Sequence, residues 1–62
     1  MSAPTYSELK ELGDRFYKAK KWEQALKAYD EAEEVDILAA SEDDDFYFKR
    51  GFVFFELNRL DE

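Results

Sequence analysis

The sequence contains no cysteine and no histidine, and it has only one proline and two glycines. Without cysteine the chain can form neither a disulfide framework nor a thiolate metal site. Without histidine it lacks the usual general base and the commonest metal ligand. Its 62 residues are also too few for a large enzyme fold. We therefore expect no enzymatic activity, no bound metal and no cofactor.

Basic residues and long apolar runs are scarce as well. Nine lysine and arginine residues stand against 16 acidic ones, which gives a net charge of −7. Phosphates must be neutralised by basic side chains, so the excess of acid argues against nucleic acids and anionic membrane surfaces as partners. No apolar run approaches the roughly 18 residues of a membrane span, and we expect no membrane insertion. The absence of cysteine fits a reducing compartment, and we expect a cytoplasmic protein.

Apolar residues at helical spacing fill the first two thirds of the chain. Thr5 and Glu8 form a capping-box pattern, which predicts a helix over residues 6–19. A second apolar run with spacings of three and four begins at Trp22 and predicts a helix to at least Asp36. None of the next four residues, up to Ala40, breaks a helix. We expect residues 1–5 to be disordered.

An acidic segment separates these two helices from a third. Ser41 is a candidate N-cap, and the third predicted helix takes residues 46–57, with almost no polar face. The acidic run at 42–45 lacks the alternating ligands and the glycine of a calcium loop, so we interpret it as a solvated surface. Residues 59–62 have the pattern of a fourth helix that begins there.

Small and aromatic residues recur at fixed distances from Gly13. Aromatic residues follow it by three, nine and sixteen positions, and alanines follow it by twelve and nineteen. Together with Leu12, which precedes Gly13, this spacing resembles the tetratricopeptide repeat (TPR). The pattern restarts at Tyr47, with Gly51 and an aromatic residue three positions later. Gly51 follows Gly13 by 38 positions, about one helical turn more than the usual repeat of about 34 residues.

The resemblance implies an all-α fold, in which a helix-turn-helix repeat and one further helix make a three-helix fragment of a right-handed superhelix. Residues 6–37 are expected to form the first repeat, 38–45 an acidic linker or helix extension, and 46–62 the truncated first helix of a second repeat. Glycine and alanine let helices approach closely, and aromatic side chains fill the remaining space. The expected packing residues are Leu12, Gly13, Phe16, Trp22, Ala25, Tyr29, Ala32, Gly51 and Phe54.

In the TPR fold the first helix of each pair lines a concave groove, and the resemblance implies that this chain binds a protein or peptide there. The residues expected to face the groove are Lys10, Asp14, Tyr17, Phe48, Lys49, Phe52 and Phe55, with Lys18 as a further candidate. We therefore interpret the chain as a protein–protein interaction module, a fragment of a scaffold or adaptor. A related hypothesis is that the first repeat only caps a longer array.

Two alternatives remain open. One branch of the TPR family clamps the carboxylate of chaperone tails, and Lys10 matches the first lysine of that co-chaperone clamp. Asp14 and Lys49 stand where the clamp has asparagines, and an aspartate would repel a ligand carboxylate. The other alternative is a three-helix trafficking module similar to the MIT domain, although the leucine-glycine and alanine-aromatic-alanine spacing favours the TPR.

The third predicted helix carries more apolar side chains than one short chain can cover. Phe54, Leu57 and Leu60 would lack a covering helix, while three further phenylalanines face the expected groove. Repeat units cannot bury such faces alone, and a patch of this kind exceeds what small monomers usually expose. We expect the isolated chain to self-associate through this helix.

Overall fold

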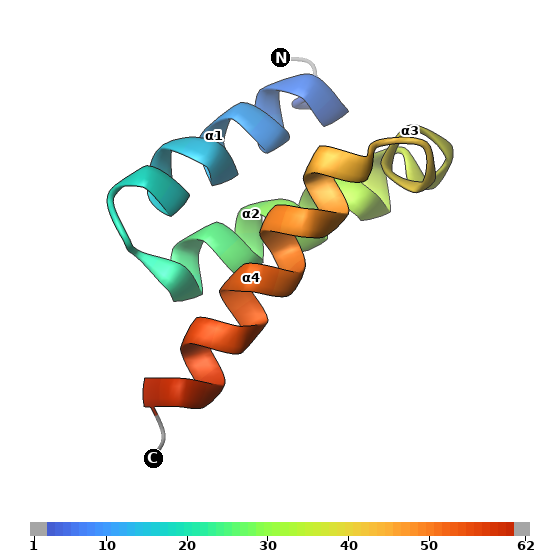
Figure 1. Ribbon diagram of the computed structural model, residues 1–62. Coiled ribbons are helices and arrows are strands. Elements are labelled where there is room, and N and C mark those ends of the chain that lie inside the picture. The colour runs from blue at the N-terminus through green and yellow to red at the C-terminus, as the bar shows by residue number, and fades with distance from the viewer. Residues whose placement is uncertain (1–2, 61–62) are drawn as a thin grey trace.

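The computed structural model describes residues 3–60, and these residues form four helices. The helices are α1 (Tyr6–Lys18), α2 (Trp22–Val35), α3 (Ile37–Ser41) and α4 (Asp44–Leu60). Figure 1 shows that α2 runs antiparallel to α1. It also shows that α4 crosses α2 and runs in the same direction as α1. The predicted all-α fold is confirmed, with four helices in place of three because the short α3 follows α2. No helix within this described part combines the length and apolar character needed to cross a membrane.

The predicted capping box fixes the start of α1. Thr5 Oγ1 accepts a hydrogen bond from the Glu8 N–H at 3.2 Å, and the Glu8 carboxylate accepts one from the Thr5 N–H at 3.0 Å. These bonds, chiefly the one from the Thr5 backbone, hold the pKa of Glu8 below its usual range. Thr5, which was expected to be disordered, is instead the N-cap of α1. Met1 and Ser2, from the same expected segment, lie outside the described residues. Residues 61–62 also lie outside them.

The turn between α1 and α2 contains a lysine in the left-handed conformation. Lys20 has a φ of 61°, in a region that costs a residue with a side chain roughly 1–2 kcal/mol. Its N–H donates to the Tyr17 carbonyl at 3.0 Å, and the Lys21 N–H donates to the Phe16 carbonyl at 2.9 Å. This pair of bonds is the Schellman motif, which usually places glycine at this position. Because a lysine stands there, the turn carries no helix-stop signal in the sequence.

Asp36 divides the long apolar run into two helices. Its backbone has a φ of −151° and a ψ of 86°, which ends α2 at Val35. Its side chain accepts a hydrogen bond from the Ala39 N–H at 3.1 Å and so caps α3. The five residues of α3 lie between Gly13 and Gly51, whose spacing is about one helical turn longer than in the usual repeat.

Asp43 caps α4, and the prediction that Ser41 does so is wrong. The Asp43 carboxylate accepts a hydrogen bond from the Phe46 N–H at 3.1 Å, whereas Ser41 ends α3 and donates its hydroxyl to the Leu38 carbonyl. An ionised carboxylate is favoured at this position because it also meets the positive end of the helix dipole. As a result, α4 begins at Asp44, before the predicted start at Phe46.

Tyr29 lies at the centre of the core and has no exposed surface. Its ring lies 5.4 Å from the ring of Phe46 in α4, in a T-shaped arrangement. The same ring covers Gly13 in α1, where an added Cβ would lie 2.6 Å from Tyr29 Cε1. One side chain of α2 therefore packs against both neighbouring helices. The other buried members of this core are Leu9, Ala25, Ala32, Ala40 and Val53.

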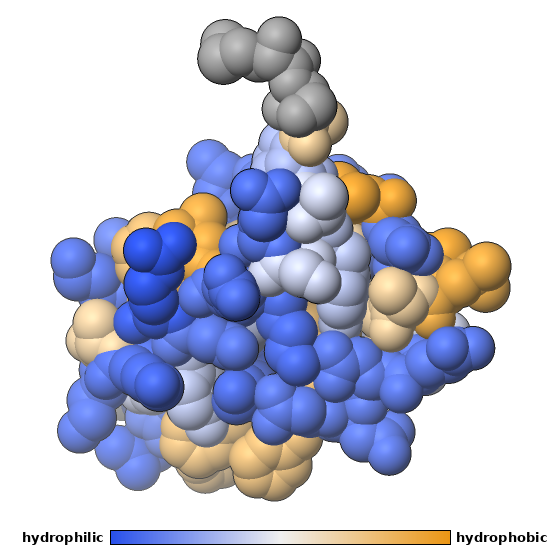
Figure 2. Space-filling view, turned by 90° about the horizontal axis from the view of Figure 1, so that it is seen from above, coloured by the Kyte–Doolittle hydropathy of each residue, from blue (hydrophilic) through white to orange (hydrophobic). Residues whose placement is uncertain are grey.

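Three of the predicted packing residues lie at the surface. At Gly51, no atom of residues 3–60 lies within 4 Å of the place that a Cβ would take. The prediction that another helix approaches closely at Gly51 is therefore wrong. The reason is that α4 turns Phe46 and Val53 inward, which leaves Gly51 on its exposed side. Leu12 and Phe54 are also exposed, by 36% and 42%. Seen from above, the surface is mainly hydrophilic, with separate hydrophobic patches at its margins (Figure 2).

Replacing each glycine by alanine should have opposite effects. In Gly13→Ala the new methyl group meets the buried Tyr29 ring, and overpacking of this kind costs about 1–3 kcal/mol. In Gly51→Ala the methyl group meets open space, and the higher helix propensity of alanine adds about 0.5–1 kcal/mol. Thermal unfolding followed by circular dichroism should give a lower midpoint for the first variant and a higher one for the second. Equal midpoints would contradict the position of the Tyr29 ring.

Lys20→Gly should stabilise the fold by up to about 1 kcal/mol. Glycine removes the left-handed strain, and this gain exceeds the entropy that glycine adds to the unfolded chain. Lys21→Gly is the matched control in the same turn, because Lys21 has a φ of −91° and no strain to relieve. Thermal unfolding should therefore show a higher midpoint for Lys20→Gly and a lower one for Lys21→Gly. A lower midpoint for both would be at odds with the turn described.

Candidate functional site

Five charged side chains form a ladder of ion pairs between α1 and α4. Lys10 Nζ lies 2.8 Å from Asp43 Oδ2 and 3.3 Å from Asp45 Oδ2. Lys49 Nζ lies 3.1 Å from the same Asp45 oxygen and 3.4 Å from Asp14 Oδ1. The charges alternate, so each lysine is shared between two carboxylates. We call these five residues the ion-pair ladder.

Two tyrosine hydroxyls tie the ion-pair ladder to the core. Tyr6 Oη donates a hydrogen bond to Asp43 Oδ2 at 2.8 Å, and Tyr29 Oη donates one to Asp14. Burial, and then the bond to Asp14, raises the pKa of Tyr29 well above its usual range. Burial and the bond to Asp43 raise the pKa of Tyr6 in the same way. Both hydroxyls therefore remain protonated and act as donors.

The ion-pair ladder favours ionised carboxylates. Burial by itself raises the pKa of Asp43, but the ion pair with Lys10 and the hydrogen bond from Tyr6 outweigh it, and the pKa is lowered. The pKa of Asp45 is lowered chiefly by Lys49 and then by Lys10. Each lysine is partly desolvated, which lowers its pKa, yet the neighbouring carboxylates raise the pKa overall. The folded structure therefore stabilises the charged forms of Asp43, Asp45, Lys10 and Lys49.

Beyond the ion-pair ladder, three aromatic rings meet. The Tyr17 ring centre lies 5.7 Å from that of Phe52 and 5.7 Å from that of Trp22, and Trp22 and Phe52 are 5.8 Å apart. The rings come from α1, the start of α2 and α4. Each remains partly exposed. We call these three residues the aromatic cluster.

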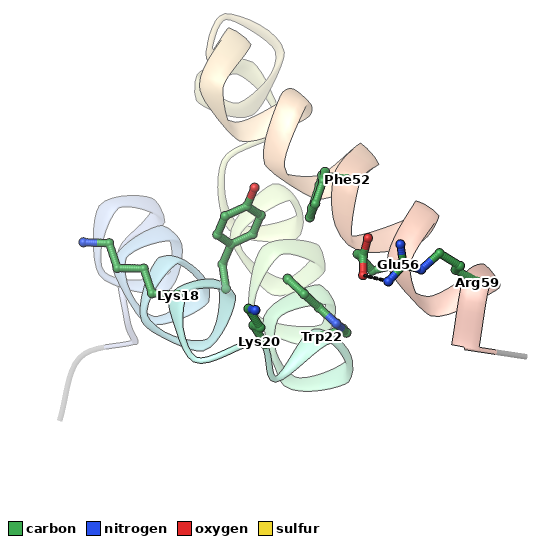
Figure 3. Close-up of a pocket in the computed structure, with 7 residues that line it drawn as sticks. Lys18, Lys20, Trp22, Phe52, Glu56 and Arg59 are labelled. Carbon is green, nitrogen blue, oxygen red and sulfur yellow. Dashed lines mark ion pairs between the residues drawn. The ribbon is translucent and has the colours of Figure 1, made fainter.

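The aromatic cluster lines a groove with a volume of about 640 Å³. Figure 3 shows Trp22 and Phe52 extending toward this groove from α2 and α4, with Glu56 and Arg59 further along α4. Ligand pockets in proteins typically have volumes of about 300–1,000 Å³. The groove is therefore large enough for one or more side chains of a partner.

The rim of the groove is basic, although the chain as a whole is acidic. Three cations, Lys18, Lys20 and Arg59, line the groove together with one acid, Glu56. The Glu56 carboxylate lies 3.8 Å from the Arg59 guanidinium, so it offsets part of that charge. Within residues 3–60, Lys18 and Lys20 have no carboxylate oxygen within 4 Å. Lys20 lies beside Trp22, while Lys18 extends outward (Figure 3).

The predicted groove residues occupy two different places between α1 and α4. Tyr17 and Phe52 line the groove. Lys10, Asp14 and Lys49 belong to the ion-pair ladder, where each charge already has a partner. They support the groove and do not line it.

Phe48 and Phe55, the other two members of the predicted stripe at 48, 52 and 55, are not among the residues that line this groove, although the Phe55 ring centre lies 6.4 Å from that of Phe52. Their side chains are 70% and 59% exposed. The side of α4 that faces α1 carries Asp45, Lys49 and Phe52, at spacings of four and three. Phe48 precedes Lys49 by one residue, and one residue turns a helix by about 100°. This rotation carries Phe48 to the flank of α4.

Three residues of the groove were not predicted: Lys20, Glu56 and Arg59. The left-handed turn that presents Lys20 has no sequence signal. Glu56 could have been found, because it follows Phe52 by four residues and so lies on the same face of α4. Trp22 was assigned to packing alone, but it both packs against the core and lines the groove.

A second, smaller hollow of about 230 Å³ lies between α1 and α2. Leu12 and Phe16, both predicted packing residues, line it together with Ala28. Lys27 and Glu31 are its charged residues, one of each sign. This hollow offers less volume and no net charge, so the larger groove is the candidate site.

The ion-pair ladder should make stability fall on acidification. The folded pKa values of Asp43 and Asp45 are lowered, so the unfolded chain binds more protons and stability is lost as pH falls from about 5 toward 2. Asp43→Asn keeps an N-cap acceptor but loses the ion pair with Lys10. It should be less stable than wild type at pH 7, and its denaturation midpoint should fall less between pH 7 and pH 3.

Asp44→Asn is the matched control, since it makes the same change in charge at an exposed neighbouring position. Chemical denaturation at several pH values should show a nearly wild-type pH dependence for this control. The same flattening in both variants would contradict a specific role of Asp43.

A comparison with protein families adds to these observations. A family model described as TPR repeat matches residues 13–58, more than half of the chain. Searches against curated proteins and against solved structures find no match. TPR repeats generally mediate protein–protein interaction and are not usually enzymes. Given this match and the helix-turn-helix fold, the chain belongs to the TPR family.

Proposed function

We propose that this TPR chain is a protein-interaction module that binds a peptide or helix of a partner protein in the groove at Tyr17, Trp22 and Phe52. The observation that carries this proposal is the aromatic cluster, whose partly exposed rings lie within 5.8 Å of one another. Aromatic residues in well-packed pockets contribute much of the binding energy of protein interfaces. Removing apolar surface from water contributes roughly 25 cal/mol per Å² to the free energy of association. A partner that covers these rings would gain this free energy.

The ion-pair ladder supports the proposal because it fixes α1 against α4 next to the groove. Its last members, Asp14 and Lys49, lie one helical turn from Tyr17 and Phe52. A groove that is already formed loses less conformational entropy when a partner binds.

The chemistry of the groove suggests the kind of segment that fits it. A large apolar side chain would pack against Trp22 and Phe52, and carboxylates beside it would meet the cations of the rim. Acting in this way, the chain would serve as an adaptor or scaffold component, and we propose the cytoplasm as its location.

The co-chaperone alternative has weaker support. That clamp requires a free lysine amino group, but Lys10 Nζ is 2.8 Å from Asp43 and 3.3 Å from Asp45. Lys49 is likewise held between Asp14 and Asp45. A chaperone tail would have to displace these internal carboxylates. The TPR match also favours the repeat over an MIT-like module.

Self-association through α4 is a second candidate function, which the exposed aromatic side chains of that helix favour. Phe48 is 70% exposed, and Tyr47, Phe54 and Phe55 are exposed as well. Contiguous exposed apolar surface often marks an interaction site. These four side chains lie outside the groove, so substitutions can separate the two functions.

A library of random peptides displayed on phage tests the groove directly. Selected peptides should combine a large apolar residue with neighbouring acids. They should shift the emission of Trp22, the single tryptophan of the chain. Their affinity should fall about tenfold or more in Phe52→Ser, which removes one ring of the aromatic cluster.

Phe48→Ser is the matched control, because it removes a phenylalanine from the same helix outside the groove. It should bind the selected peptides like wild type. Peptides that bind all three proteins equally, or that leave the Trp22 emission unchanged, would contradict the groove as the binding site.

A further inference from the structure

The two ends of α2 differ in chemistry. At its C-terminal end the side chains of Val35, Ile37 and Leu38 are exposed, the last two by 66% and 73%. We call these three residues the α3 tip. The groove lies at the N-terminal end of α2, where Trp22 begins the helix. Figure 1 shows α3 and the turn between α1 and α2 at opposite ends of α2.

The α3 tip stands in a strongly acidic stretch. No lysine or arginine occurs between Lys27 and Lys49. Five acids of this stretch are exposed and, among the residues that the structure describes, lack a lysine or arginine nitrogen within 4 Å: Glu31, Glu34, Asp36, Glu42 and Asp44. The α3 tip is therefore a small exposed apolar surface surrounded by negatively charged side chains.

The groove has the complementary chemistry. Its aromatic cluster offers apolar contact, and Lys20 and Arg59 supply positive charge at the rim. A chain with a net charge of −7 repels its own copies on average. Placing the acidic tip against the basic rim replaces that repulsion with local attraction.

We propose that the α3 tip of one copy docks in the groove of a second copy, with Leu38 packing against Trp22 and Phe52. The proposal rests on the groove function proposed above and names its occupant. The contact cannot form within one molecule, because the 14 residues of α2 span about 21 Å and separate the tip from the groove.

Docking of tip into groove is a head-to-tail contact. Such a pair keeps one free groove, on one copy, and one free tip, on the other, so association continues beyond the dimer unless the rotation closes a ring. Pairing of α4 with α4 is self-complementary and stops at a dimer. The two modes therefore differ in the size of the assemblies and in the substitutions that abolish them.

Two variants separate the two halves of the contact. In the groove variant, Lys20→Asn and Arg59→Glu remove two of the three cations of the rim, and Arg59→Glu adds a negative charge. Asparagine at position 20 tolerates the left-handed turn. Trp22→Phe removes the tryptophan signal. In the tip variant, Ile37→Ser and Leu38→Lys remove the two most exposed apolar side chains of the tip and place a positive charge there. Apart from Trp22, all the substituted residues are exposed, so both variants should keep the helical circular dichroism spectrum of the wild type.

Sedimentation velocity from about 10 μM to about 1 mM, the range in which small interfaces dissociate, should show wild-type assemblies larger than dimers. Each variant alone should remain a monomer. An equal mixture should form a dimer and no larger species, because the tip of the groove variant fills the one intact groove. The emission of Trp22, which only the tip variant retains, should shift to shorter wavelength on mixing. Salt at about 0.5 M should weaken the mixed dimer by about tenfold.

Phe48→Ser should associate like the wild type. If Phe48→Ser abolishes association while the groove and tip variants do not, α4 pairing is the mode and the head-to-tail proposal is wrong. A wild type that stays monomeric throughout also overturns it. In both cases peptides that shift the Trp22 emission would uphold the groove function and remove only the second copy as its occupant.

Discussion

The contact between the buried Tyr29 ring and Gly13 holds α2 against α1, and the rest of the structure is arranged around it. The same side chain meets Phe46 of α4 with its ring and Asp14 of α1 with its hydroxyl. A domain of this length buries only about 60% of its unfolded surface, so few side chains can act in this way. Because packed interiors leave little free space, one ring that touches two helices fixes the position of both.

The groove follows from how α1 and α4 are aligned. Three contacts between them join residues 35 positions apart, namely 10 with 45, 14 with 49 and 17 with 52. A constant offset means that the two helices run side by side in one register. However, α1 ends at Lys18, only one residue after Tyr17, whereas α4 continues to Leu60. The last turns of α4 therefore project past the end of α1, and the groove lies in the space that this difference in length leaves.

Features that depend on local sequence chemistry were predictable. The capping box at Thr5 and the spacing of small and aromatic residues after Gly13 led to the helix pair and to the TPR resemblance. The break at Asp36 was not predictable, because the residues on both sides of it favour a helix. The cap that ends α2 and begins α3 depends on a single aspartate side chain. The turn at Lys20 was hidden because a lysine adopts a conformation that usually marks glycine.

The site was harder to predict than the fold for a reason that lies in α4 itself. This helix carries apolar residues on nearly every side, so helical spacing alone does not show which side faces α1. Tyr17, Phe48, Phe52 and Phe55 were all assigned to the groove. Tyr17 and Phe52 line it, whereas Phe48 and Phe55 each lie one position from the face of α4 that carries the contacts with α1. That face is marked by the charges of Asp45 and Lys49, whose partners in α1 only the tertiary structure reveals.

The net charge of −7 is a poor guide to what the groove attracts. At physiological salt the field of an exposed charge decays over about 8 Å. The acidic α3 tip lies beyond the far end of α2, whose 14 residues extend about 21 Å from the groove. Most of the negative field of the tip is therefore screened before it reaches Trp22. A partner that approaches the groove meets the cations Lys20 and Arg59, so local geometry, and not the total charge, decides which sign of partner this surface accepts.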